Sequence, residues 1–195
     1  MAIAQQPLVE GARRRRWRRD EYYRMVEAGI LGENERVELI GGEILELAAE
    51  YAPHSTGVGL VQYALMAVFG RGYVVRVQHP LWLGDSDPEP DVAVVTGRHR
   101  DYATEHPTSA LLVVEVSHAT LAYDRTQKMA LYARAAIPEY WILNLVDRQL
   151  EVHRDPTELR RDGFGYRTRL VLRGDEAVAP LARPDAAIPV VDLLP

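Results

Sequence analysis

Apolar and polar positions follow two distinct periods along this chain. Runs with a period of two, together with short continuous apolar runs, predict strands, and they occupy residues 36–40, 43–47, 73–83, 91–95, 111–116, 139–146, 149–155 and 165–172. Apolar residues at helical spacing predict helices near residues 20–29, 54–69 and 121–135. Helices that alternate with groups of strands are typical of a mixed α/β domain.

Glycine and proline mark where several of these elements end. The pair Gly41-Gly42 separates two alternating runs, which predicts a β-hairpin over residues 36–47. Pro80 should break or bend the strand over residues 73–83, and Pro138 should end the third helix. The part of the chain after Gly174 is dotted with prolines and is predicted to be irregular.

One strand carries a charge that calls for an explanation. Residues 111–117 read LLVVEVS, an apolar and β-branched run that is typical of a strand buried on both faces, yet Glu115 lies near its end. An isolated ionised carboxylate in a protein interior costs roughly several kcal/mol unless a partner compensates it. We therefore expect a partner for Glu115.

A second carboxylate, Asp91, begins the strand DVAVV. If the two strands are neighbours in one sheet, the carboxylates of Asp91 and Glu115 can lie a few ångströms apart. Two adjacent carboxylates repel each other, and a hard divalent cation such as magnesium or manganese relieves that repulsion. The pair is therefore a candidate metal site.

The basic residues contain one exception. Of the 23 lysines and arginines, 22 are arginine, and the single lysine is Lys128. Lysine is a compact charge that can reach a single water or phosphate oxygen, whereas arginine is a planar fork. Asp124, Lys128 and Tyr132 follow at i, i+4 and i+8 and should form one ridge of the third helix, facing the carboxylate pair.

Length and charge limit the class of protein. A chain of 195 residues fits one domain, which we expect over residues 20–195 after a basic arm at residues 1–19. The net charge of −5 argues against a general nucleic-acid coat protein but not against a local basic groove. Six arginines around Trp17, at residues 13–19, reverse the acidic balance locally.

Three further expectations concern the compartment. The chain has no cysteine, so it offers neither disulfides nor thiolate metal ligands. No apolar run approaches the roughly 20 residues of a membrane span, and the N-terminus lacks the apolar core of an export signal. We therefore expect a cytoplasmic protein without membrane contact.

Together the segments resemble the PD-(D/E)XK nuclease superfamily and, within it, the restriction endonuclease-like Uma-two family. The resemblance is carried in order by RVELIGGEILEL, by PDVAVV at residues 90–95, and by VVEVS, LAYDRTQKMALYARAAIPEYWILNL and EVHRDP. It implies a restriction endonuclease-like mixed sheet flanked by helices, with an N-terminal helix and a β-hairpin. It also implies a magnesium- or manganese-dependent endonuclease that acts on DNA as a homodimer.

The resemblance assigns roles to the residues that match its motifs. It implies that Asp91 and Glu115, with the backbone carbonyl of Val116, hold the metal ion. The superfamily usually has lysine two residues after the second acid, where this chain has Ser117, and the resemblance implies that Lys128 takes over that role. Lys128 would then orient the attacking water or offset charge on the phosphate.

Three candidates are more remote from the motifs. Glu38, in the predicted hairpin, is expected to supply a further carboxylate that acts through its neighbours. His54 is a candidate for proton transfer, and Asp124 is a candidate for orienting Lys128. Each also has a plain structural explanation: Glu38 would face water, His54 would occupy a helix N-terminus, and Lys128 would be a solvated residue paired with Asp124.

Two other functions stay open at this point. One is a metal-dependent phosphodiesterase that acts on small nucleotides. The other is a non-catalytic module of the same fold that binds nucleic acid through the arginines of residues 13–19.

Overall fold

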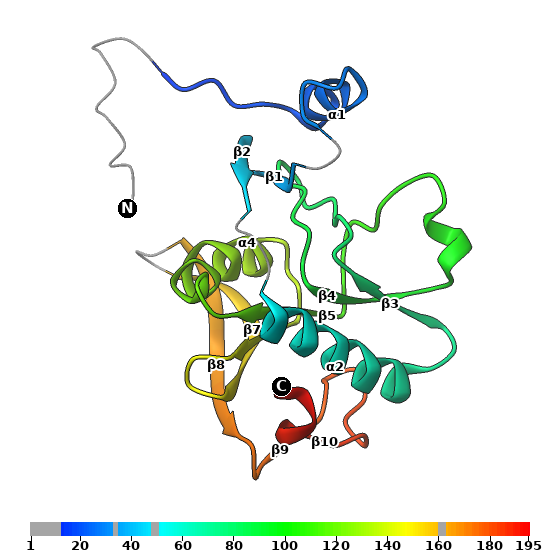
Figure 1. Cartoon of the computed structure of the whole chain (residues 1–195), viewed down its shortest axis with the longest axis vertical. Helices are drawn as coiled ribbons and strands as arrows, with labels where there is room; N and C mark the ends of the chain where they lie inside the picture. Colours follow the sequence, from blue (N-terminus) through cyan, green and yellow to red (C-terminus); the bar gives the residue numbers. More distant parts are fainter. Residues whose placement is uncertain (1–12, 33–34, 48–50, 160–162) are drawn as a thin grey trace.

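The structure of the protein is a computed structural model that describes residues 13–32, 35–47, 51–159 and 163–195 (Figure 1). Residues 1–12 of the predicted arm lie outside this part. The principal elements are α1 (Arg19–Glu27), β1 (Val37–Ile40), β2 (Glu43–Glu46), α2 (Ala52–Phe69), β3 (Tyr73–Val77), β4 (Val92–Thr96), η1 (His99–Tyr102), β5 (Leu112–Ser117), α3 (Leu121–Tyr123), η2 (Asp124–Lys128), α4 (Met129–Arg134), β6 (Glu139–Asn144), β7 (Gln149–Leu159) and β8 (Gly163–Arg173). A short pair, β9 (Ala177–Val178) and β10 (Ile188–Pro189), and the 3-10 turn η3 (Val190–Leu193) follow.

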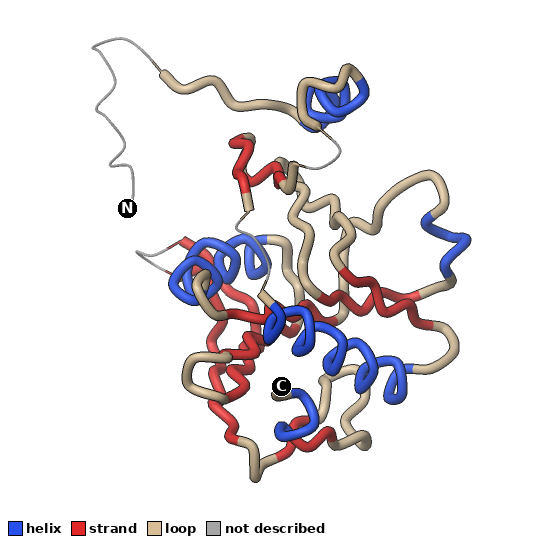
Figure 2. Tube along the Cα trace, in the orientation of Figure 1, coloured by secondary structure: helices blue, strands red, loops and turns tan. Residues whose placement is uncertain are grey.

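A mixed sheet forms the centre of the molecule, as predicted, and it has six strands (Figure 2). Its strand order is β3-β4-β5-β6-β7-β8. Neighbours are antiparallel except for β5 and β6, which are parallel. Parallel neighbours need a long crossover connection, and here the helical segment of residues 121–134 provides it.

Side chains alternate between two core layers on the two faces of this sheet. Val92 and Val94 of β4 pack with α2 and the C-terminal tail, while Ala93 and Val95 pack with α4 and the loop around Leu81. Glu115 shares its parity with Val113, which belongs to the α4 layer. The α4 face of β5 is thus the face that receives the carboxylate.

Helix α2 lies unusually close to the end of β5. A Cβ atom added to Gly57 would meet Cγ1 of Val116 at 3.0 Å, so only glycine allows this approach without displacement of the neighbour. The helix begins at Ala52, two residues before the predicted start. The close packing places the first turn of α2, which contains His54, beside the carboxyl end of β5.

The predicted hairpin is confirmed as β1 and β2. Gly41 and Gly42 have φ angles of 57° and 78°, and positive φ at both central residues is the geometry of a tight two-residue hairpin turn. The turn is tied to the chain before α1, because the Trp17 N–H donates to the Gly42 carbonyl at 2.8 Å. Arg19 of α1 in turn donates to Asp87 at 2.7 Å. In Figure 1 the hairpin and α1 lie together at one end of the molecule.

Two predicted elements differ in the structure. The strand predicted over residues 73–83 ends at Val77, because Gln78 adopts a left-handed conformation with a φ of 49° and Pro80 follows. The apolar residues beyond it, Leu81 and Leu83, are buried in a loop instead. The tail after Gly174 is mostly irregular, as predicted, but contains the β9–β10 pair.

The helix predicted over residues 121–135 contains a π-helical turn, η2, between α3 and α4. The Met129 N–H donates to the Asp124 carbonyl, five residues earlier. In a regular α-helix, side chains eight positions apart drift by about 80° around the axis; a wider turn reduces this drift. Asp124, Lys128 and Tyr132 are all buried, and the predicted ridge is formed. Within the described residues, no helix has the length and apolarity needed to cross a membrane.

Candidate active site

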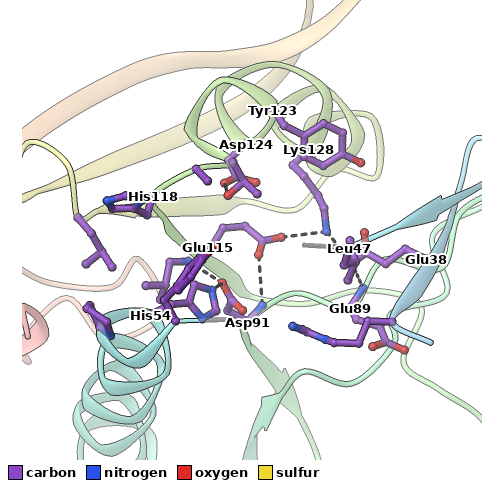
Figure 3. A pocket seen from close by; sticks show the side chains of 17 residues that line it. Glu38, Leu47, His54, Glu89, Asp91, Glu115, His118, Tyr123, Asp124 and Lys128 are labelled. Atoms are coloured by element: carbon purple, nitrogen blue, oxygen red, sulfur yellow. Dashed lines mark hydrogen bonds and ion pairs between the residues drawn. The ribbon is translucent and has the colours of Figure 1, made fainter. Parts of the chain in front are cut away.

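Asp91 and Glu115 lie against each other where β4 begins and β5 ends. The antiparallel register pairs Val92 with Val114, so the residues beyond each partner are adjacent. The Asp91 N–H donates to Oε2 of Glu115 at 3.3 Å, and the Val116 N–H donates to Oδ2 of Asp91 at 2.8 Å (Figure 3). The structure therefore brings the predicted carboxylate pair together.

Lys128 reaches the same point from η2. Its Nζ lies 2.8 Å from Oε1 of Glu38 and 3.3 Å from Oε1 of Glu115. Tyr132 donates its hydroxyl to Oε1 of Glu115 at 2.6 Å. Lys128 is only 4 % exposed, so its explanation as a solvated helix residue is wrong. Lys128 and Tyr132, two residues of the predicted ridge, are thus the partners expected for Glu115.

Charge balance in this cluster is uneven. Burial raises the pKa of Glu115 to about 8, and the charges of Asp91, Asp124 and Glu38 add to this effect, while Lys128 opposes it. Burial by itself would lower the pKa of Lys128, but Glu115 and Glu38 outweigh it and hold the pKa above its usual value. The site thus has a permanently charged lysine and a carboxylate that is incompletely compensated.

Glu38 occupies the hairpin side of the cluster. It is 1 % exposed, so the alternative in which it faces water is wrong. Its Oε1 accepts a hydrogen bond from the Glu89 N–H at 2.7 Å as well as the contact with Lys128. Glu89, which no sequence motif indicated, lines the same pocket. Burial and the nearby charge of Glu38 raise the pKa of Glu89.

His54 contacts the carboxylate pair directly. It belongs to the first turn of α2, as its plain structural explanation requires. Its Nε2 also lies 3.1 Å from Oδ2 of Asp91. A role in proton transfer stays a prediction, but the geometry places the imidazole where it could hold or transfer a proton at Asp91.

Asp124 does not pair with Lys128, which corrects its expected role. Among the described residues, the ion pairs of Lys128 are those with Glu38 and Glu115. Oδ2 of Asp124 instead accepts hydrogen bonds from Ser117 at 2.8 Å and from Thr120 at 2.7 Å. Ser117 is the last residue of β5, and Thr120 directly precedes α3. Asp124 and Ser117 therefore fix that turn to the end of β5.

A pocket of about 190 Å³ opens onto this cluster. Its lining includes all the charged candidates and, in addition, Tyr51, His118, Tyr123 and Leu145. The sequence assigned no role to Tyr123 or His118, because the places of both depend on how the chain turns after β5. Tyr132 belongs to the predicted ridge, and its hydroxyl donates a hydrogen bond to the carboxylate of Glu115.

The oxygen atoms of the site are of the type that binds hard divalent cations. Asp91, Glu115 and the Val116 carbonyl offer oxygen ligands, which magnesium and manganese prefer. In the part of the chain that the structure describes, no group of three or more His, Cys, Asp or Glu could hold a metal ion. A two-carboxylate site leaves positions for water and substrate, and magnesium usually keeps several waters.

The same fold is found among the solved structures. A crystal structure described as "a putative nuclease belonging to DUF820 from Anabaena variabilis ATCC 29413" matches with a TM-score of 0.67 and 15% identity, over 89% of this chain and 95% of that chain. This similarity shows that the two proteins share a fold. It confirms the predicted fold class.

The family follows from a second comparison. The model of the Uma2 family, described as "Putative restriction endonuclease", matches residues 19–190. The chain belongs to the Uma2 family, and the resemblance of its motifs is confirmed. No curated protein matches the chain.

Proposed function

We propose that the protein is a divalent-metal-dependent endonuclease that hydrolyses phosphodiester bonds in DNA. One observation carries the proposal: Asp91, Glu115 and Lys128, distant in the sequence, converge within hydrogen-bond or ion-pair distance in one pocket. Membership of a family described as restriction endonucleases supports the coarser statement that the protein is a nuclease.

Asp91, Glu115 and the Val116 carbonyl would hold the metal ion. The chemistry supplied there by a bound divalent cation is stabilisation of negative charge on the phosphate and a lowered pKa of bound water. The raised pKa of buried Glu115, about 8, supports this assignment, since it indicates that the protein by itself does not fully compensate the ionised carboxylate. A nearby cation favours the ionised form of such a carboxylate.

The other residues of the site would position these groups. The Val116 N–H and the Tyr132 hydroxyl fix one oxygen each of Asp91 and Glu115. Lys128 donates a hydrogen bond to Glu38 and forms an ion pair with Glu115, and its ammonium group has three N–H donors, so donor capacity is available to a phosphate oxygen or a water. Glu38 would hold the ammonium group of Lys128 in place. The imidazole of His54, beside Asp91, would carry a proton or accept one.

The arginines before α1 support DNA as the substrate. The side chains at residues 13–16 and 18 are exposed, and Arg16 donates to the Gly41 carbonyl of the hairpin at 2.9 Å. The Trp17 N–H contact with Gly42 holds this segment at the same turn. Exposed arginines bind phosphates through charge and bidentate hydrogen bonds. The segment would therefore follow the nucleic-acid backbone near the hairpin that carries Glu38.

The direct test is cleavage of supercoiled plasmid by the wild-type protein in magnesium or manganese, compared with EDTA. Asp91→Asn should reduce the rate by about 100-fold or more, the scale seen when one group that stabilises transition-state charge is lost. Asp175→Asn is the matched control, because Asp175 is exposed, and it should cleave like the wild type.

Three results would contradict the proposal in different ways. Turnover of cyclic or short nucleotides alone would favour the phosphodiesterase. Salt-dependent DNA binding in EDTA, with no cleavage in either metal, would favour the binding module. Equal rates for Asp91→Asn and wild type would remove Asp91 from the site. The predicted homodimer is part of the proposal, because cleavage of both DNA strands needs two pockets, and sedimentation of the protein with and without DNA tests it.

A further inference from the structure

Tyr123, the last residue of α3, carries a hydroxyl group without a partner. The side chain lines the pocket, and its Oη is buried and makes no hydrogen bond within the described part of the chain. Burial raises the pKa of Tyr123 to about 12. At neutral pH the group is therefore a hydroxyl with a proton to donate.

Other tyrosines with buried or half-buried rings satisfy their hydroxyl groups within the protein. The hydroxyl of Tyr132 donates to Glu115, that of Tyr140 to the Asp124 carbonyl, and that of Tyr166 to the Ile137 carbonyl. Tyr22 likewise donates to the Val37 carbonyl. A buried polar group without a partner destabilises a fold and calls for an explanation. The exception at Tyr123 coincides with the pocket.

The surroundings of Tyr123 indicate what the missing partner would be. Figure 3 shows Tyr123 and Lys128 projecting from the same helical segment toward the same region of the pocket. Lys128 donates one hydrogen bond, to Glu38, and forms an ion pair with Glu115, so its ammonium group retains N–H donor capacity. Two donors that point into one pocket suit a group that only accepts hydrogen bonds and carries negative charge. The non-bridging oxygens of a phosphodiester have both properties.

We infer that Tyr123 is a substrate-positioning residue whose hydroxyl donates a hydrogen bond to a non-bridging oxygen of the phosphodiester held beside Lys128. The inference rests on the proposed function and adds a residue to which the resemblance assigned no role. It explains why a hydroxyl is kept in a buried place where phenylalanine would satisfy the fold.

The variant Tyr123→Phe tests the inference by removal of one oxygen atom. Its kcat/KM for DNA should fall by about tenfold to a hundredfold, the scale of a hydrogen bond to a charged group. Its thermal stability should equal or exceed that of the wild type, because the hydroxyl has no partner to lose. The matched control is Tyr63→Phe, since Tyr63 is 79 % exposed on α2, and it should change neither quantity.

A binding measurement separates this inference from the proposed function. In the Asp91→Asn background, fluorescence anisotropy with a labelled duplex should show several-fold weaker binding for Asp91→Asn/Tyr123→Phe than for Asp91→Asn alone. Equal affinities, or equal rates of Tyr123→Phe and wild type, would overturn the inference. Loss of stability in Tyr123→Phe would also overturn it, because the hydroxyl would then serve the fold. A wild-type protein that cleaves no DNA would overturn the proposed function, and the affinities would still decide the role of Tyr123.

Discussion

Glu115 and Glu151 lie at the same level of the central sheet, with strand β6 between them, but the charged groups around them differ. Glu115 of β5 is paired in register with Ile142 of β6, and Ile142 is paired in register with Glu151 of β7. Both carboxylates are buried, at 6 % and 0 % exposure. Residues in register on neighbouring strands point to the same face of a sheet, so both meet the helical segment of residues 121–134.

Glu151 is compensated by several donors. Arg125 donates to it at 3.1 Å, Asn144 at 3.0 Å and Arg169 at 2.9 Å. Burial alone would raise the pKa of Glu151, but these donors outweigh it and lower the pKa to about 2. Glu115 has one hydroxyl, a backbone N–H at 3.3 Å and a lysine shared with Glu38, and its pKa is raised to about 8.

The difference teaches that burial of a carboxylate in a strand does not by itself indicate a functional site. The balance between the buried charge and its donors carries the information. The η2 turn supplies both sides of the comparison, since it directs Arg125 to Glu151 and Lys128 to Glu115. The donors around Glu151 fully compensate its carboxylate, whereas the carboxylate of Glu115 can still accept a ligand.

The largest expected effect separates the two cations. Lys128→Met leaves Glu38 and Glu115 buried without a cation, and removal of one partner from a buried pair costs about 3–5 kcal/mol of unfolding free energy. Arg125→Met leaves Glu151 with Arg169 and Asn144, and the Arg125 side chain is 35% exposed, so its loss should be nearer to 1 kcal/mol. Urea unfolding of both variants measures the difference. Equal losses would show that the two clusters are equivalent.

The next effect is a difference in sign. Glu151→Gln should lose about 1–3 kcal/mol, because Arg125 and Arg169 lose their charged acceptor. Glu115→Gln in EDTA should become more stable than the wild type as the pH rises from 4.5 to 8. The folded wild type keeps the Glu115 proton up to a pKa of about 8, whereas the unfolded chain releases it near 4.5. The wild type therefore loses stability through that window, and Glu115→Gln does not.

Thermal unfolding of the three proteins between pH 4.5 and 8.5 checks this prediction. A Glu115→Gln variant that is destabilised at pH 8.5 as much as Glu151→Gln would contradict it. A second measurement is the addition of magnesium at pH 8.5. A cation bound at Glu115 should raise the melting temperature of the wild type but not that of Glu115→Gln.

The smallest effect concerns His153, two residues after Glu151. Burial lowers its pKa from 6.5 to about 4, although Glu151 opposes the shift. The unfolded chain takes up a proton near pH 6.5, but the folded protein does so only near pH 4. Stability is therefore complete above pH 6.5 and falls as the pH drops, by about 1–2 kcal/mol at pH 5. Between pH 6.5 and 5, the melting temperature of the wild type should fall more steeply with decreasing pH than that of His153→Gln. Equal slopes for the two proteins would refute the prediction.

The sequence allowed prediction of those features that depend on local pattern. The sheet, the hairpin and the Asp124–Lys128–Tyr132 ridge follow from periodicity and spacing, and Glu115 was noticed because its strand is apolar. Glu151 was not distinguished from other acids, since its donors Arg125 and Arg169 come from distant segments. Glu89 and Tyr123 could not be predicted for the same reason. Their places in the pocket depend on how distant segments of the chain come together, which a local sequence pattern does not show.

The π-helical turn at residues 124–128 has a consequence for how this segment tolerates changes of length. Such a turn contains one residue more than an α-helical ladder of hydrogen bonds would use. A deletion of a single residue there would restore an ordinary α-helical turn and leave the later side chains near their present orientation, whereas a deletion inside α4 would rotate every later side chain by about 100°. The extra residue therefore lets one short segment direct Arg125 to Glu151 and Lys128 to Glu115 while Tyr132 keeps its orientation toward Glu115.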